Sequence, residues 1–300
     1  MAIRSETRNR LMGPRLSLSL ILSYVLLIAA AVVTTMPFLW MVSTSFKADE
    51  DIFHATPQWI PQVYDFANYS DAYNAIDMGT LFTNTAFVTV IDVLGQILLG
   101  AMAGYVFARL NFPGKKVIFF SLLATMMVPF EVLIIPIFLF IRYFPLAGGN
   151  DLIGQGGIGL LNSYGGIIFP NLVSVFGIFL FRQFFLSFPR EIEEAAIIDG
   201  CSLAKVFWII LLPNSKPVIG TLALFSFLWV WNDFLWPLVV IKEDALNTLQ
   251  LGLSSFNQEV GTAWAEMMAG SVMVTIPVIF LFLFLQRFLN QGIATTGLKG

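Results

Sequence analysis

The sequence predicts an all-α polytopic membrane protein with six transmembrane helices, and three observations lead to this fold class. Of the 300 residues, 57% are hydrophobic and only 12% are charged, which is far from the balance of a soluble domain. Several windows are apolar for long enough to cross a bilayer as helices, which takes about 20 residues. Lysine and arginine gather on one side of these windows, as expected of a chain that crosses a membrane repeatedly.

We place the six predicted spans, in chain order, at about 18–42, 81–110, 117–143, 165–185, 218–241 and 263–289. The four arginines before the first span would also suit a signal peptide. However, the apolar run continues to Trp40, longer than the core of a typical signal peptide, so a retained span is the preferred interpretation. The chain then divides into an N-terminal segment (1–17), a six-helix transmembrane domain (18–289) and a C-terminal tail (290–300).

The positive charges predict the orientation of the loops. Only three of the 16 lysines and arginines, Lys47, Arg142 and Lys242, fall on one side of the predicted spans. The richer side is expected to be cytoplasmic. Both termini and the segment 186–217 are therefore predicted in the cytoplasm. The acidic segment 47–80, the glycine-rich segment 144–163 and the polar segment 242–262 are predicted outside.

Composition also excludes several functions. The net charge of −3 gives no sign of nucleic-acid binding, and the single cysteine, Cys201, excludes an intrachain disulfide. The single histidine, His54, argues against a histidine-rich metal centre and against Ser–His or Cys–His catalysis. No Gly-x-x-x-x-Gly-Lys-Ser/Thr motif occurs, so any ATP chemistry has to come from another chain. We predict no cofactor or metal bound by this chain, and no enzyme.

A short charged segment interrupts the hydrophobic sequence between the fourth and fifth spans. Pro189 followed by several glutamates is typical of a helix start, and Gly200 suits a left-handed C-cap. A second helix is predicted to begin near Ser202, and Pro213 and Pro217 are predicted to interrupt it before the fifth span. The residues alone are compatible with a helix that merely lies at the membrane surface.

The spacing in this segment is more specific. Glu194-Ala195-Ala196, then Gly200, Ile210 and Leu212-Pro213 resemble the EAA loop, here 186–217, of permease subunits in binding-protein-dependent ABC importers. The resemblance extends along most of the chain, to the second permease of maltose-type carbohydrate importers, the MalG-like proteins. It rests on Asn84-Thr85, Ala103-Gly104-Tyr105, Ala108-Arg109, Phe112-Pro113-Gly114-Lys115, Met127-Val128-Pro129, Ile135-Pro136, Trp231-Asn232-Asp233-Phe234, Trp236-Pro237-Leu238, Gly270-Ser271 and Pro277.

The resemblance implies a type I importer fold in a bacterial cytoplasmic membrane. The chain would pair with a second, homologous permease to form a pore for a sugar or oligosaccharide. Two ATPase subunits would hold ATP and Mg, and a soluble extracytoplasmic binding protein would deliver the substrate. A cytoplasmic coupling helix would dock on an ATPase through Ile192, Glu194, Ala195, Ala196, Asp199 and Gly200.

Polar residues within the apolar windows are candidates for function. Asp92, Glu131 and Asp233 each cost about 2.5–3.5 kcal/mol to insert into a membrane. We predict a substrate pathway through Trp231, Asn232, Asp233 and Glu131. The alternatives are a helix-packing network and, for Glu131, support of a proline kink. In the outer loop, Phe256 as an aromatic tip, Asn257 and Gln258 are predicted to contact the binding protein, although an ordinary solvated loop fits equally.

Two other functions are compatible with some of these residues. An ion-coupled secondary transporter could use Asp92, Glu131 and Asp233 as cation sites, but the sequence has no convincing pair of inverted repeats. A membrane-embedded enzyme would need a nucleophile with a base, or a metal centre, which one histidine and one cysteine do not supply.

Overall fold

The computed structural model describes residues 18–53, 56–258 and 261–294. The predicted N-terminal segment 1–17, His54 and the end of the predicted tail (295–300) lie outside these ranges. Within them the chain is largely helical, and a two-residue antiparallel ladder pairs β1 (Asn257–Gln258) with β2 (Gly261–Thr262). The predicted all-α fold class is confirmed.

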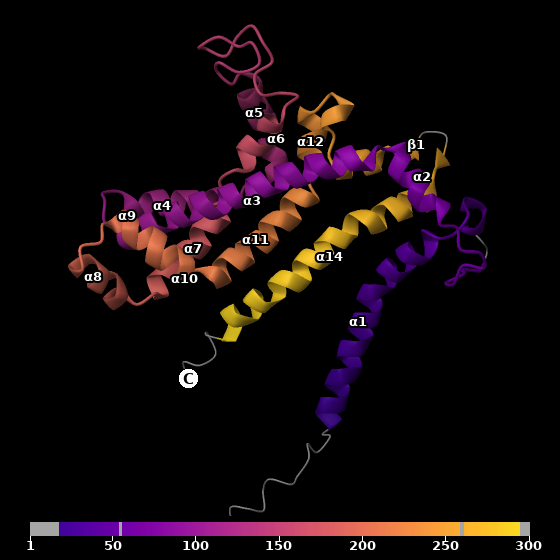
Figure 1. The fold of residues 1–300 in the computed structure, drawn as a ribbon, viewed down its shortest axis with the longest axis horizontal. Coiled ribbons are helices and arrows are strands. Elements are labelled where there is room, and N and C mark those ends of the chain that lie inside the picture. Colours follow the sequence, from indigo (N-terminus) through magenta and orange to yellow (C-terminus); the bar gives the residue numbers. More distant parts are fainter. Residues whose placement is uncertain (1–17, 54–55, 259–260, 295–300) are drawn as a thin grey trace, which may run out of the picture.

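Three helices are each long and apolar enough to cross a membrane alone: α1 (Leu18–Thr44), α3 (Met78–Arg109) and α14 (Trp264–Ala294). They coincide with the first, second and sixth predicted spans. In Figure 1, α3 and α14 belong to the main helical body, whereas α1 extends away from it. Most apolar side chains of α1 are exposed, which suits a helix whose solvent is lipid.

The third and fourth predicted spans are broken rather than continuous. In the third, α4 (Lys115–Thr125) and α5 (Phe130–Arg142) meet at an angle of 105°. The break ends at Pro129, which is the N-cap of α5 and has no backbone N–H for a continuing helix. In the fourth, α6 (Tyr164–Ile168) with η2 (Phe169–Asn171) meets α7 (Val175–Ser187) at 41°, and the Ser174 hydroxyl accepts from Gly177 N at the start of α7.

The fifth predicted span is divided differently. Its first part, α11 (Lys216–Trp231), follows α9 (Leu203–Val206), the π-helical turn η3 (Phe207–Leu211) and α10 (Leu212–Asn214) at a bend of 74°. After α11 the helix stops at Asn232 and Asp233, and α12 (Leu235–Val240) follows. By length and composition, the described residues provide three spans, or up to six when each bent pair counts as one.

Small residues bring the central helices close together. α3 packs against α7 and α11, and α11 packs against α14. A Cβ atom placed on Gly104 of α3 would lie 2.6 Å from Cβ of Phe181 and 2.9 Å from the backbone N of Arg182 in α7. Close backbone approach at small residues is the usual way in which membrane helices pack.

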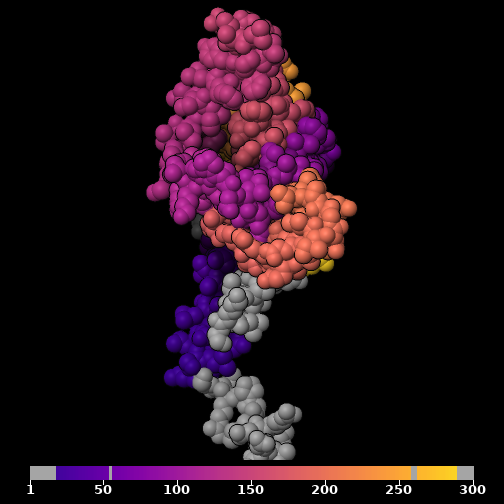
Figure 2. Space-filling view, turned by 90° about the vertical axis from the view of Figure 1, so that its left-hand side faces the viewer, coloured from indigo at the N-terminus to yellow at the C-terminus, as the bar shows by residue number. Residues whose placement is uncertain are grey.

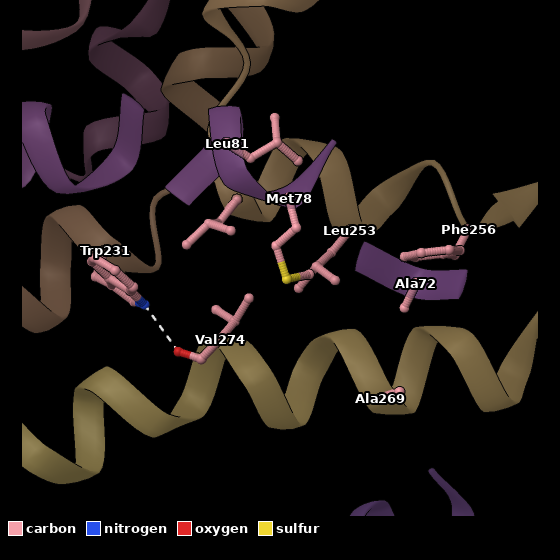
Figure 3. Close-up of a cluster of buried hydrophobic side chains, with 9 residues drawn as sticks. Ala72, Met78, Leu81, Trp231, Leu253, Phe256, Ala269 and Val274 are labelled. Carbon is pink, nitrogen blue, oxygen red and sulfur yellow. Dashed lines mark hydrogen bonds between the residues drawn. The ribbon is translucent and has the colours of Figure 1, made fainter. Parts of the chain in front are cut away.

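The two ends of α3 carry different structures (Figure 1). Near its first residue lie α2 (Ala67–Ala75), α13 (Leu249–Ser254) and the short ladder. Their buried side chains form a cluster with α14 that includes Met78, Leu81 and Leu253 (Figure 3). Near its last residue lies α8 (Arg190–Ile198), with α9 and α10. Figure 2 views this end, where the magenta residues around α4 and the orange residues of α8 to α10 share one face.

Candidate functional site

The segment that resembles the EAA loop forms a short helix with well-defined ends. α8 begins after Pro189 and carries Glu191 and Glu193 in its first turn, where negative charge suits the helix dipole. Gly200, which follows the C-cap, has φ +88°. The backbone N of Cys201 donates to Ala196 O and that of Gly200 donates to Ile197 O, both at 2.9 Å. These two bonds form a Schellman motif, so the predicted left-handed end at Gly200 is confirmed.

The helix predicted to follow begins at Ser202, whose hydroxyl accepts from Lys205 N at 3.3 Å. The π-helical turn and the 74° bend come just before and after Pro213. Side chains satisfy two carbonyls in this stretch, because Asn214 Nδ2 donates to Ile210 O at 2.6 Å and Ser215 Oγ donates to Leu211 O at 2.7 Å. The segment therefore changes direction without leaving these two carbonyls unpaired.

Most residues predicted to couple to an ATPase lie at the surface. Ile192 is 47% exposed, and Glu194, Ala195, Asp199 and Gly200 are exposed as well. Ala196 is half-buried and packs against the cluster that contains Phe207 and Leu211. The face of α8 that turns inward is thus anchored, while the motif residues remain available to a partner.

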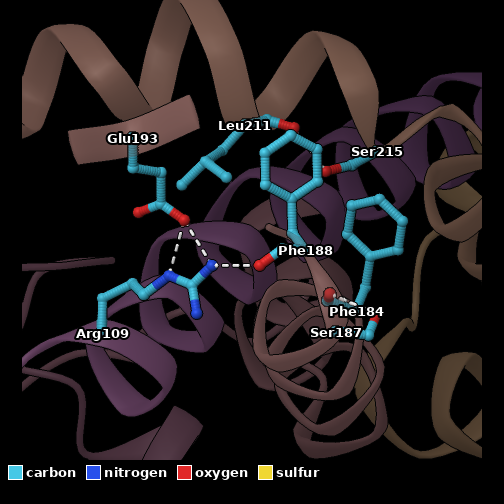
Figure 4. Close-up of polar contacts among 7 residues, drawn as sticks. All are labelled: Arg109, Phe184, Ser187, Phe188, Glu193, Leu211 and Ser215. Atoms are coloured by element: carbon cyan, nitrogen blue, oxygen red, sulfur yellow. Dashed lines mark hydrogen bonds and ion pairs between the residues drawn. The ribbon is translucent and has the colours of Figure 1, made fainter. Parts of the chain in front are cut away.

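An ion pair that the sequence did not reveal anchors α8 (Figure 4). Arg109, the last residue of α3, donates through Nε and Nη2 to Glu193 Oε1, with an Nε–Oε1 distance of 2.7 Å. Its Nη2 also donates to the backbone oxygen of Phe188 at 2.9 Å. Both side chains are only 8% exposed. In the sequence, Arg109 belongs to the Ala108-Arg109 motif, and no local pattern links it to Glu193, 84 positions away.

This pair fixes the orientation of α8 relative to α3. Two buried charges are costly to desolvate, so the pair adds little net stability compared with apolar residues. Removing one partner is different, since it leaves the other charge buried and uncompensated. The arrangement is therefore well suited to hold two helices in one geometry.

The predicted substrate-pathway residues do not form a single site. Trp231 is 2% exposed, and its indole N–H donates to Val274 O at 3.2 Å (Figure 3). Its ring stacks on that of Phe227. It packs helices together in this structure and has no open face toward a pathway. Glu131 is exposed in the first turn of α5.

Asn232 and Asp233 occupy the break between α11 and α12. Asp233 Oδ1 accepts from Trp236 N at 3.2 Å and so caps α12. Asn232 is exposed, and its Oδ1 accepts from Gln250 Nε2 at 3.3 Å. These two amides, with Phe38, Leu253, Ser271, Val274, Thr275 and Val278, line a cavity of about 280 Å³. Of the four predicted pathway residues, only Asn232 lines it.

A second cavity, mostly apolar with polar groups on one side, is not predicted from the sequence. Gln96 of α3 donates to Asn171 O at 2.7 Å and accepts from the Ser226 hydroxyl of α11 at 2.6 Å. These residues line a cavity of about 350 Å³ together with Phe176, Phe225 and Trp229. One turn before Gln96, Asp92 is fully buried, and neither of its carboxylate oxygens has a hydrogen-bond partner among the described residues.

The polar segment 242–262 differs in part from its prediction. Phe256 is 4% exposed and belongs to the buried cluster of Figure 3. Its ring packs within this cluster, so the prediction of an exposed aromatic tip is wrong. Asn257 is exposed in β1, and its side-chain oxygen lies 3.1 Å from the Thr262 hydroxyl. The side chain of Gln258 lies outside the described residues. Contact of Asn257 with a binding protein stays a prediction.

Bent helix pairs around a central long helix, with a short capped helix exposed at one end, are features of a multi-pass membrane protein. Comparison with known proteins identifies the family. Residues 96–295 match the family described as binding-protein-dependent transport system inner membrane component. The chain belongs to this family, and it is a permease subunit of the sugar ABC importer type rather than an enzyme.

Several named relatives span nearly the whole chain. The chain is 32% identical to an arabinooligosaccharides transport system permease of Halalkalibacterium halodurans, covering 93% of this chain and 98% of the relative. It is 31% identical to a diacetylchitobiose uptake system permease of Streptomyces coelicolor, covering 88% and 91%. It is 28% identical to an sn-glycerol-3-phosphate transport system permease of Yersinia pestis, covering 91% and 95%.

A solved structure supports the same fold. The chain is similar to a chain in the crystal structure of a bacterial ABC transporter involved in the import of the acidic polysaccharide alginate. The TM-score is 0.78 at 25% sequence identity, and the match covers 92% of this chain and 100% of that chain. The type I importer permease fold expected from the EAA-like spacing is therefore confirmed.

Proposed function

We propose that this chain forms one half of an import pore for a sugar or oligosaccharide, and that α8 docks on a separate ATPase that powers it. The observation that carries the proposal is the exposure of Glu194, Ala195 and Gly200 on a helix that Arg109 holds against α3. Small side chains allow a partner surface to approach closely, and the Schellman end gives the helix one defined length.

The route from α8 into the membrane runs along α3. This helix is continuous from Met78 to Arg109, so movement of α8 would be carried along its length. At the opposite end, Asn84 Nδ2 donates to the backbone oxygens of Ala245 and Asn247, and Thr85 Oγ1 accepts from Leu249 N. ATP binding and hydrolysis in the partner would thereby reach the outer loop that contains these acceptors.

The partners follow from the family. A second, homologous permease would complete the pore, two ATPases would carry ATP and Mg, and a soluble binding protein would deliver the substrate. Both termini and α8 would lie in the cytoplasm, as the lysine and arginine distribution predicts. The chain itself would bind no cofactor.

A sugar fits the chemistry of the cavities. The cavity beside Asn232 offers two amides, two hydroxyls and the ring of Phe38, and the cavity beside Gln96 offers amides, Ser226 and aromatic rings. Amides and hydroxyls hydrogen-bond sugar hydroxyls, while aromatic rings cover the apolar faces of sugar rings. The named relatives transport different sugars or a polyol phosphate, which supports the class of substrate and not one compound.

The coupling role is tested by reversing the charge at Glu194 and by forcing a side chain onto Gly200. Glu194→Lys and Gly200→Val should leave membrane insertion and pairing with the second permease intact. Recovery of the ATPase on co-purification, and ATP-dependent uptake, should fall at least tenfold. Glu243→Lys, an equal charge reversal in the predicted outer loop, is the matched control. Normal ATPase recovery and normal uptake in both α8 variants would overturn the proposal.

A further inference from the structure

A basic cavity lies at the end of the molecule that carries α8, between the C-terminal end of α3, α4 and α7. Its volume is about 450 Å³. Three cationic side chains line it together with two amides and an aromatic and aliphatic wall: Lys115, Lys116, Arg182, Asn111, Gln183, Phe119, Phe120, Leu123 and Phe179. None of these residues belongs to the predicted coupling surface or to the predicted substrate pathway.

The positive charges of this cavity have no acidic partner among the described residues. Lys115 Nζ donates to the backbone oxygen of Leu110 at 2.7 Å, and Arg182 Nε donates to that of Phe107 at 3.3 Å. The ion pair found at this end of the described chain joins Arg109 to Glu193 instead. Arg182 and Arg190 both act on Lys115 with like charge. Carbonyl oxygens do not neutralise this charge, so an anion in the cavity would be stabilised.

The start of α4 adds to this demand for an anion. Gly114, at the N-cap, has φ +78° and provides no side-chain acceptor for the first N–H groups of the helix. Two lysines then occupy the first turn, at the positive end of the helix dipole, where acidic residues are normally favoured. Helix starts of this kind bind phosphate groups.

The walls of the cavity indicate which kind of anion fits. The guanidinium of Arg182 lies over the ring of Phe119 at 4.2 Å, with Phe120 and Leu123 further along α4. Val117 and Phe120 are 70% and 66% exposed on the same helix. The charged groups thus sit at the edge of an apolar surface that belongs to a helix of a membrane protein. A soluble phosphate ion would make no contact with this apolar surface. A lipid would, because its anionic headgroup is joined to acyl chains that can cover it.

We propose that this cavity binds the phosphate headgroup of an anionic phospholipid, with its acyl chains lying along the exposed apolar face of α4. Basic pockets between membrane helices on the cytoplasmic side bind such headgroups. The bound lipid would hold α4 against α7 and against the end of α3. The residues that bind the headgroup, Asn111, Lys115 and Lys116, follow Arg109 closely in sequence. The bound lipid would therefore stabilise the region that carries α8. The placement of this cavity on the cytoplasmic side of the membrane rests on the proposed function, whereas its lining and charges do not.

The experiment uses the full-length chain, purified with the subunits that accompany it and reconstituted in nanodiscs that contain phosphatidylcholine with a small fraction of phosphatidylglycerol. Co-purified and enriched lipids are measured by native mass spectrometry. The unaltered protein should retain phosphatidylglycerol preferentially. The Lys115→Gln/Lys116→Gln double variant and the Arg182→Gln variant should each reduce that preference at least fivefold. Lys205→Gln, which removes a lysine of α9 outside the cavity, should leave it unchanged.

Each alternative occupant has its own result. If inorganic phosphate displaces the lipid completely at millimolar concentration, the site takes a soluble anion and the lipid proposal is overturned. If the variants lose the ATPase while lipid retention is unchanged, the cations serve a protein partner, which also overturns it. An equal loss in Lys205→Gln would indicate unspecific surface charge and would count against the site.

Folding and function are separated by two further readings. Size-exclusion profiles should be unchanged for the lysine double variant, whose side chains are not buried, so this variant keeps the test informative if Arg182→Gln fails to fold. Lipid retention does not depend on a bound ATPase. Loss of coupling in the Glu194 and Gly200 variants, with lipid selectivity retained, would contradict neither the lipid site nor its headgroup. Normal coupling with no lipid selectivity in the unaltered protein would refute the lipid site and leave the coupling role intact.

Discussion

The contact between Arg109 and Glu193 links α3 to α8 at the end of the molecule that carries the EAA-like residues. Both side chains are nearly inaccessible, and the guanidinium also satisfies the carbonyl of Phe188, where α7 ends. One arginine thus joins the ends of two transmembrane segments to the helix that carries the EAA-like residues. The pair acts through position, since neither side chain is exposed to a partner.

We expect Arg109→Gln and Glu193→Gln each to destabilise the protein by about 3–5 kcal/mol, because each leaves one buried charge without its partner. Thermal unfolding of the purified chain in detergent measures this. The exchanged pair, Arg109→Glu with Glu193→Arg, should recover part of the loss but not all of it, since the Phe188 carbonyl then loses its donor. Unchanged unfolding in both single variants would show that the pair is not a structural link.

A positioning role makes a further demand on these variants. ATPase that still binds to the Arg109→Gln protein should hydrolyse ATP with less sugar imported per ATP. A purely structural role would lower ATP hydrolysis and sugar uptake in the same proportion, because it reduces only the amount of folded protein. The ratio of uptake to hydrolysis therefore distinguishes the two roles.

At the level of elements, the sequence predicted the positions of helices better than their directions. The windows for α1, α3 and α14 are close to the observed helices, because their hydrophobic runs are long and free of breaks. The 105° turn between α4 and α5 was not predicted, although Pro129 marks the place. Proline alone does not decide where a helix stops, because Pro37, Pro136 and Pro277 lie inside continuous helices. The angle at Pro129 depends on packing partners far away in sequence.

The candidate site divides in the same way. The ends of α8 could be predicted because caps depend on local residues, here Pro189 and Gly200. The ion pair of Arg109 and the burial of Phe256 and Trp231 could not, because each depends on contacts between distant segments. The polar sequence around Phe256 predicts an exposed ring, whereas the ring is buried in a cluster formed by distant segments.

The packing of α3 on α7 gives a prediction about two glycines. Gly104→Ala should destabilise the protein by about 1–3 kcal/mol, because its Cβ would lie 2.9 Å from the backbone N of Arg182, which cannot move without shifting α7. Gly95→Ala is the matched control in the same helix. Its Cβ would lie 2.4 Å from Cδ1 and 3.0 Å from Cγ of Leu172, two side-chain atoms that can move by a change of rotamer without shifting the backbone. Equal unfolding temperatures for the two variants would contradict a tight α3–α7 contact.

For the whole molecule, α3 connects two regions that lie at opposite ends of the protein (Figure 1). One end holds α8 through Arg109, and the other holds the loop before α13 through Asn84 and Thr85. Because the helix runs unbroken between them, a displacement at one end has a direct mechanical path to the other. The bent helices around it lack such a continuous path.

This arrangement predicts a signal at the outer loop when ATP acts at the other end. An environment-sensitive fluorophore can be attached through Asn257→Cys after the native thiol is removed by Cys201→Ser. Adding ATP to the assembled importer should change its emission. The same label in an Arg109→Gln background should show a much smaller change at equal ATPase occupancy. A full-sized change in that background would show that the signal travels by another route.

The wide sequence separation of Arg109 and Glu193 also bears on how the protein is made. Arg109 is synthesised well before Glu193, so its guanidinium has no carboxylate partner until α8 has been translated. The oriented docking surface comes into existence only after both segments are in place. An ATPase that requires that orientation would bind only those chains in which this ion pair has formed.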